Sequence, residues 1–216
     1  AQFLSAIAKN PVNALYYKRY GLFLAQKGRR EKAAEMLEQS VALEPISADN
    51  ALEYGSLLVA MGRAESGIGF LKKAVMLDED MLDRVLTTLS ANGFSPGQAA
   101  AAVPEMTGPV IGYAGFLADM GQTAAAAEQF LRALELMEQG AEASRRYVYA
   151  VYRFFFRHGR TRQAMDVLLR AEPLLPEEAN IRVWLGDLYR QQGIFYKAEE
   201  KYQAALMIDP DNQRAQ

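Results

Sequence analysis

Glycines recur in this chain at a fixed spacing of 34 residues, and this spacing constrains the fold more than any other feature. The pairs are Gly21 and Gly55, Gly28 and Gly62, and Gly159 and Gly193. An apolar segment precedes each turn glycine and an alanine-rich segment follows it. Gly121 keeps the local pattern but is out of phase with both blocks. Such a period is typical of stacked helix-turn-helix arrays, so we expect an all-α fold of helix pairs.

The composition favours an ordered chain without affinity for polyanions. Of the 216 residues, 50% are hydrophobic and 23% are charged, which provides enough apolar surface for a folded array. Lys and Arg number 24 against 26 for Asp and Glu, so the net charge is −2 and we expect no nucleic-acid partner. Cysteine is absent, which excludes disulfides and thiolate metal sites.

No stretch approaches the roughly 20 apolar residues that a membrane helix needs. The longest apolar cluster, residues 147–156, is interrupted by Arg153, so we expect no direct membrane insertion in this segment. The sequence begins at Ala1 without Met and ends without a polar capping helix. We therefore expect a piece of a longer chain, and the compartment, cytoplasmic or periplasmic, stays open.

The first full unit, residues 14–47, shows how one helix pair is encoded. Tyr17 and Leu24 fall at helical spacing on one face. Gly28 follows at a position suited to the left-handed backbone that ends helices, and Pro45 stops the second helix.

The last unit carries the fullest pattern: Leu185, Gly186, Tyr189, Gly193, Ala198, Tyr202, Ala205 and Pro210. This order of Leu-Gly and Tyr, then Ala, an aromatic residue, Ala and a closing Pro resembles the tetratricopeptide repeat. Five units with this local pattern carry the resemblance, at 14–47, 48–81, 107–140, 145–178 and 179–212. It implies a single tetratricopeptide solenoid of bacterial type over residues 1–216, a right-handed superhelix of antiparallel helix pairs.

Two segments depart from this pattern. Residues 82–106 are predicted to form a shortened, degenerate helix pair, with a helix over 82–91 and a second one capped by Ser95 and continuing to Val103. We expect a kink or a change of superhelical pitch there. Residues 1–13 are predicted to be a partial repeat or a capping helix.

The sequence offers no catalytic, cofactor-binding or metal-binding residues. His158, the single histidine, sits beside a predicted turn, where a solvated or helix-capping role is expected. Residues 62–67 have the glycine spacing of a phosphate-binding loop, but Ile68 stands in place of its lysine. The acidic residues 78–80 lack the glycine and terminal glutamate of a calcium loop. We therefore expect a protein that is not an enzyme.

The resemblance implies that the first helix of each pair lines a concave groove that holds a peptide. Projected onto the last two units, the candidate groove residues are Arg146, Tyr149, Arg153, Phe156, Arg157, Val183, Asp187 and Arg190. Residues 141–170 contain seven arginines against two acidic residues. Apolar anchors and guanidinium groups together suit an acidic or carboxylate-bearing peptide. Alternatively, the arginines form a solvated face and part of residues 154–156 belongs to the core.

Two other regions bear on partner binding. On the equivalent face of the middle unit lie the small residues Gly108, Gly112, Gly115 and Ala118, which would admit a ligand backbone or pack against a neighbour. Lys18 matches the lysine of the carboxylate-clamp subclass that holds chaperone tails. Leu22 stands where that clamp needs asparagine, and Asp49 and Glu53 follow instead of donors, so this function is disfavoured.

The leading hypothesis is a non-catalytic scaffold whose groove binds a protein or peptide, an acidic one in particular. A first alternative is an accessory extramembrane domain of a larger bacterial enzyme or membrane protein, such as a polysaccharide polymerase or ligase. A second is a self-assembly module, in which unfinished array ends associate.

Overall fold

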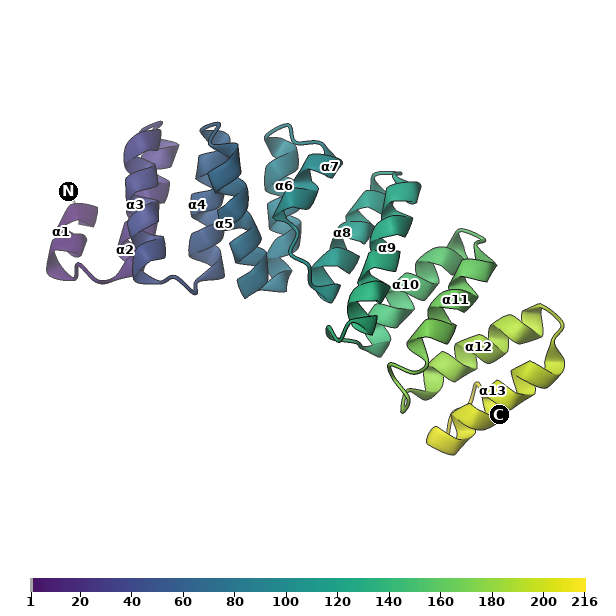
Figure 1. Ribbon diagram of the computed structural model, residues 1–216. Coiled ribbons are helices and arrows are strands. Elements are labelled where there is room, and N and C mark those ends of the chain that lie inside the picture. The colour runs from purple at the N-terminus through teal and green to yellow at the C-terminus, as the bar shows by residue number, and fades with distance from the viewer. Residues whose placement is uncertain (1) are drawn as a thin grey trace. The chain divides into compact units, whose positions relative to one another are not determined.

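The computed structural model describes residues 2–216, and within them it consists of helices and turns without a strand (Figure 1). The predicted all-α architecture is thus confirmed. The chain divides into two compact units, residues 2–104 and residues 105–216, which we call the N-terminal unit and the C-terminal unit. The division falls inside 82–106, the segment predicted to be a shortened helix pair.

The N-terminal unit is built from two full helix pairs and a shorter one. Its helices are α1 (Gln2–Lys9), α2 (Ala14–Gln26), α3 (Arg30–Leu43), α4 (Ala48–Ala60), α5 (Ala64–Leu77), α6 (Leu82–Ala91) and α7 (Pro96–Ala99), with 3₁₀ turns at Glu79–Met81 and Ala100–Ala102. Helix α2 packs on α3 and α4 on α5, and α3 also contacts α4. Each pair is therefore in contact with the next one along the chain.

The C-terminal unit contains three helix pairs. They are α8 (Thr107–Asp119) with α9 (Thr123–Glu138), α10 (Arg145–Arg157) with α11 (Thr161–Ala171), and α12 (Ala179–Gln191) with α13 (Phe195–Ile208). The first helices of these pairs, α8, α10 and α12, are the ones that the sequence places along a groove.

Glycines end the first helix of each full pair, as predicted from their spacing. Gly28 has a φ of 73° and Gly62 a φ of 79°, both in the left-handed region. The amide of Arg29 donates to the Leu24 carbonyl at 2.9 Å, and the amide of Arg63 repeats this bond to Leu58 at 2.9 Å. These bonds satisfy carbonyls that would otherwise be unpaired at the helix end.

A second set of glycines lies where the two helices of a pair cross. A Cβ atom on Gly55 would lie 2.9 Å from the carbonyl oxygen of Gly67, so neither position has room for a side chain. A Cβ atom on Gly186 would likewise lie 2.5 Å from a ring carbon of Tyr202. The loop-like spacing of residues 62–67 is therefore explained by one turn glycine and one helix-crossing glycine.

The shortened pair is smaller than the sequence predicted. Ser95 caps α7 in a capping box, in which the Gln98 amide donates to the serine hydroxyl at 3.3 Å and the Ser95 amide donates to the Gln98 side chain at 2.9 Å. The α-helix ends at Ala99 instead of reaching Val103, which is extended. A 3₁₀ turn continues the helical backbone through Ala102, so the prediction was wrong in the type of helix and at Val103, where Pro104 disfavours helical geometry in the residue before it.

Helix α1 matches the helix predicted at the start of the chain. None of its residues is fully buried, and Phe3 is its aromatic contact with α2, with ring centroids 5.5 Å from Tyr20 and 5.4 Å from Phe23. Its packing therefore depends on a few aromatic contacts with a single neighbouring helix.

Candidate functional site

Helix α10 separates an apolar side from a basic and aromatic side. It begins after Ser144, whose hydroxyl accepts a hydrogen bond from the Tyr147 amide at 3.3 Å. The buried residues are Val148, Val151, Tyr152, Phe154 and Phe155. The exposed ones include Arg146, Tyr149, Arg153, Phe156 and Arg157. Of the aromatic run 154–156, the first two residues belong to the core and the third reaches solvent.

Three arginines of this exposed face have no acidic partner. Within residues 2–216, Arg146, Arg153 and Arg157 form no ion pair. The guanidinium of Arg153 lies over the Tyr149 ring, 5.8 Å from its centroid, so part of this cation is held by an aromatic face. An anion binding here would not have to displace a carboxylate of the protein from these three arginines.

A shallow pocket of about 380 Å³ lies beside this face. Its lining residues are Arg145, Arg146, Tyr149, Asn180, Trp184 and Arg214. Arg146, Asn180 and Arg214 are separated by 34 residues each, so one position of the repeat supplies three of the six lining residues. The pocket is thus assembled by the repetition of the fold.

Two of the pocket arginines are paired. Arg145 is 3.8 Å from Glu178, and Arg214 is 2.5 Å from Asp187. With Arg146 unpaired, three cations stand against two carboxylates. The pocket therefore has one cation in excess, which matches a singly charged anion such as a carboxylate.

Aromatic rings connect α10 with α12 next to the pocket. The Trp184 ring stacks on Tyr152 at 5.6 Å with 9° between the planes, and it lies 5.1 Å from Tyr149. Tyr152 also stacks on Phe156 at 5.6 Å. Burial raises the pKa of Tyr152, and the nearby Asp187 carboxylate raises it further. The rings form a rigid wall that leaves Tyr149 and Phe156 about two-fifths exposed, at 40% and 41%.

One of the predicted groove residues, Val183, is buried and cannot contact a ligand. Val183 is completely buried, at 0% exposure, and packs in a cluster with Ala179, Ala205 and Ala215. A valine at this position is short enough to be covered by the segment that follows α13, whereas the longer Tyr149 at the equivalent position of α10 reaches the surface. The adjacent Trp184 lines the pocket instead.

Asp187 and Arg190 lie on α12 but are engaged with each other and with neighbours. Asp187 accepts a hydrogen bond from the Tyr202 hydroxyl at 2.8 Å, and Arg190 lies 3.5 Å from the same carboxylate. Arg214 completes this group, as described above. These residues position the pocket wall and are less available to a ligand than the arginines of α10.

Sequence reasoning missed four lining residues: Arg145, Asn180, Trp184 and Arg214. The period could have found two of them, because Asn180 and Arg214 follow the predicted Arg146 at 34-residue steps. Trp184 gave no such signal, since its ring is mostly covered and only the packing shows which edge it presents.

Lys18, the residue of the N-terminal unit that matches the carboxylate-clamp lysine, is engaged in an ion pair. Lys18 forms an ion pair with Asp49, and Arg84 joins them at 3.3 Å from the same aspartate and 3.1 Å from Glu53. The guanidinium and ammonium groups hold the pKa of Asp49 below its usual value, with the Lys18 hydrogen bond as the largest cause. This paired network agrees with the weak match to a carboxylate clamp.

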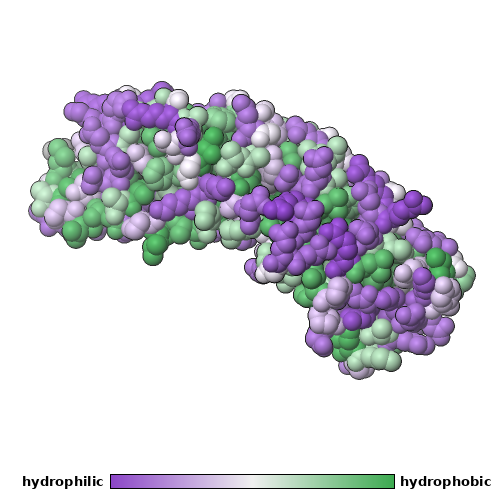
Figure 2. All heavy atoms as spheres, viewed as in Figure 1, coloured by the Kyte–Doolittle hydropathy of each residue, from purple (hydrophilic) through white to green (hydrophobic). Residues whose placement is uncertain are grey.

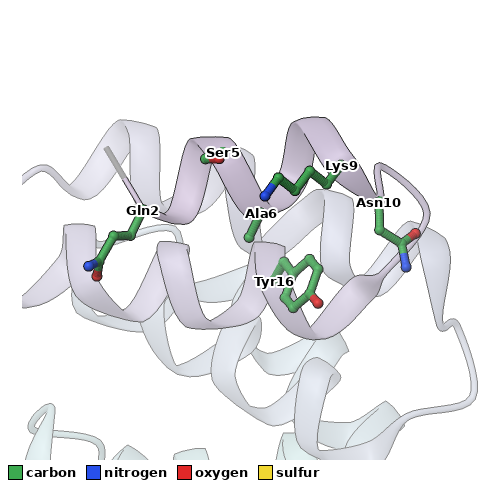
Figure 3. A pocket seen from close by; sticks show the side chains of 6 residues that line it. All are labelled: Gln2, Ser5, Ala6, Lys9, Asn10 and Tyr16. Atoms are coloured by element: carbon green, nitrogen blue, oxygen red, sulfur yellow. The ribbon is translucent and has the colours of Figure 1, made fainter.

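Another hollow lies between α1 and α2 (Figure 3). It measures about 450 Å³ and is lined by Gln2, Ser5, Ala6, Lys9, Asn10 and Tyr16. Lys9 is the one charged residue of this lining. It therefore lacks the cluster of guanidinium groups seen beside α10.

Groups with catalytic or metal-binding chemistry are sparse. Among residues 2–216, no three His, Asp or Glu side chains stand close enough to hold a metal ion. His158 caps α10, and its Nδ1 atom lies 2.8 Å from the Phe154 carbonyl oxygen.

Among residues 2–216, the helices are too short or too polar to cross a membrane. Figure 2 shows hydrophilic side chains interspersed with smaller apolar groups on the visible face.

Helix pairs joined internally by glycine turns, and packed in sequence order within each unit, define a helical-repeat protein. Proteins of this class serve in general as protein-interaction scaffolds, and the chain is one of them. Residues 15–47 and residues 179–212 each match the family model of the tetratricopeptide repeat. Both segments are therefore tetratricopeptide repeats, as the sequence pattern predicted.

Several solved structures are similar to this chain. YrrB, described as a TPR protein with an unusual peptide-binding site, is 18% identical over 100% of this chain and 96% of its own, with a TM-score of 0.44. MamA is 16% identical over 91% and 92%, with a TM-score of 0.44. The pilF protein of Pseudomonas aeruginosa is 16% identical over 94% and 79%, with a TM-score of 0.42. Among curated protein sequences, none matches.

Proposed function

We propose that this chain is a non-catalytic scaffold that binds an acidic peptide or protein segment on the exposed face of α10 and in the adjoining pocket. The observation that carries the proposal is the cluster of unpaired guanidinium groups at Arg146, Arg153 and Arg157, next to a pocket with one cation in excess. Exposed aromatic rings lie between these cations.

Guanidinium groups suit this task for a geometric reason. Each presents a planar fork of N–H donors that matches the two oxygens of a carboxylate. Since the three arginines have no ion pair to break, a ligand carboxylate gains the new bonds without first separating a protein pair. Their net charge contrasts with the −2 of the whole chain, so binding is local to this face.

Tyr149 and Phe156 supply the apolar part of the surface. Each is about two-fifths exposed and backed by buried rings, so a ligand side chain can cover it without reordering the protein. Aromatic and arginine side chains of this kind dominate the binding energy of protein interfaces. We expect affinities of about 1 μM to 100 μM, because the surface is small and open to solvent.

The test is charge reversal on α10. Arg153→Glu together with Arg157→Glu should weaken binding of a fluorescein-labelled peptide rich in glutamate by at least about tenfold, equal to about 1.4 kcal/mol. The measurement is fluorescence anisotropy, with circular dichroism to show that the helices are unchanged. Both positions are exposed, so the fold should tolerate the reversal.

A matched control separates the site from the overall charge. Arg19→Glu together with Arg162→Glu changes the net charge by the same amount at two exposed arginines on α2 and α11. Within the part of the chain that the structure describes, these arginines also form no ion pair. Equal loss of affinity in both double variants would contradict the proposed site.

A further inference from the structure

Cations and aromatic rings repeat along α10 as a doublet. Arg146 and Tyr149 form the first doublet, and Arg153 and Phe156 form the second. In each doublet the ring follows the cation by three positions, and the second doublet follows the first by seven positions. Seven residues of an α-helix advance by about 10.5 Å. A ligand that contacts both doublets in the same way must repeat its acidic and apolar groups at about this distance.

Three regular peptide conformations can be compared with this spacing. A polyproline II helix returns to the same face every three residues, or about 9.3 Å. A β-strand does so every two residues, at about 6.6 Å, or every four, at about 13 Å. An α-helix does so after seven residues, at about 10.5 Å. Polyproline II and α-helix both fit within the reach of a flexible arginine side chain, and the strand fits less well.

Two physical features favour polyproline II over the others. A helical ligand has to bury a continuous apolar stripe, but Tyr149 and Phe156 are partly exposed rings separated by arginines. A strand ligand needs an unpaired backbone edge to bond with, and the backbone of α10 is already paired within the helix. A polyproline II chain makes no internal backbone hydrogen bonds and keeps its backbone solvated, so it needs neither.

The neighbouring helix α8 leaves room for such a chain. Gly112 is exposed, and a Cβ atom on Gly115 would meet no other atom within 4 Å. Helix α8 contacts α10 in the same unit. At these two positions α8 therefore has no side chain that a ligand backbone would have to avoid.

We infer that the acidic ligand binds in a polyproline II conformation with a three-residue repeat of an acidic residue, an apolar residue and a third residue that proline suits. This inference rests on the proposed function and specifies the ligand of the same surface. Each carboxylate would pair with one guanidinium of a doublet, and each apolar side chain would cover the ring of that doublet.

The experiment compares three synthetic peptides with blocked ends and equal charge. The first contains three copies of Glu-Leu-Pro, the second has the same composition with its three Glu, three Leu and three Pro residues in separate blocks, and the third places three Glu and three Leu at seven-residue spacing in an alanine helix. Isothermal titration calorimetry with the whole chain gives each dissociation constant. The first peptide should bind at least about fivefold more tightly than either of the others.

The outcomes separate this inference from the proposed function. Equal binding of the first two peptides, with both weakened by Arg153→Glu and Arg157→Glu, would overturn the three-residue register and leave the acidic-peptide surface intact. Tightest binding of the helical peptide would overturn the polyproline II conformation in the same way. If none of the three bound, both the register and the proposed function would be wrong.

Discussion

At the scale of single residues, the two kinds of helical glycine have opposite roles. Gly55 lies where a Cβ atom would meet backbone atoms, namely the Gly67 oxygen at 2.9 Å and the Leu71 nitrogen at 3.0 Å. Gly115 faces open space. The sequence alone presents both as glycines in the middle of a predicted helix. Only the packing shows that the first is required by the crossing of two helices.

The substitution Gly55→Ala should therefore destabilise the chain by about 1–3 kcal/mol, because backbone atoms of α5 must move to make room. Gly115→Ala should be neutral or stabilise by about 0.5–1 kcal/mol, since alanine is the better helix former and nothing obstructs it. Urea denaturation followed by circular dichroism measures both. A Gly55→Ala variant as stable as the wild type would contradict the close helix crossing.

The exposure of the predicted groove residues could be derived from the sequence only in part. The positions of Arg146, Tyr149 and Arg153 could be placed on the exposed face of α10 from helical spacing alone. Val183 and Trp184 are adjacent in sequence, and which of them is covered depends on the residues that follow α13. Periodicity gives the phase of a helix to within about one residue, and this uncertainty is enough to exchange a core residue for a surface residue.

At the scale of helices, an ion-pair network joins three first helices of the N-terminal unit. Asp49 of α4 pairs with Lys18 of α2 and with Arg84 of α6, and Glu53 provides a second contact for Arg84. The network crosses two pair-to-pair contacts. The charged side chains of this network are therefore ion-paired, whereas, within residues 2–216, Arg146, Arg153 and Arg157 of α10 are not.

Acid should weaken this network in a defined direction. The pKa of Asp49 lies below its ordinary value of 3.8, mainly because of the hydrogen bond from Lys18. Its stabilising effect is therefore present above pH 3.8 and is lost as the pH falls through the lower pKa of the folded state. Asp49→Asn should destabilise the chain by about 1 kcal/mol at neutral pH and so lower its melting temperature. The difference in melting temperature between this variant and the wild type should shrink below about pH 4.

The measurement is a series of thermal melts between neutral and acidic pH, with Asp119→Asn as the control. Asp119 is exposed at the end of α8 and, within residues 2–216, has no ion pair. The control should melt at nearly the wild-type temperature at every pH. A difference between Asp49→Asn and the wild type that stayed constant with pH would show that the network contributes nothing through charge.

At the scale of the whole molecule, the fold could be predicted from the repeat, but the residues of the pocket beside α10 could be predicted only in part. The 34-residue spacing predicted the helix pairs and their glycine turns, because each repeat packs mainly on its neighbours and local pattern decides local structure. The pocket needs side chains from α10, α12 and the segment after α13. Its residues are 69 positions apart at the extremes, from Arg145 to Arg214, so only the assembled unit brings them together.

The central claim is that an acidic ligand binds at α10 and its pocket, and Trp184 offers a direct probe of it. This residue is the single tryptophan of the chain and lines the pocket beside Tyr149. Titration with the Glu-Leu-Pro peptide should change the tryptophan emission with a saturable curve that gives the same dissociation constant as calorimetry. The change should disappear in Arg153→Glu with Arg157→Glu and persist in Arg19→Glu with Arg162→Glu. Saturable binding by calorimetry without any change in tryptophan emission would place the ligand elsewhere and contradict the claim.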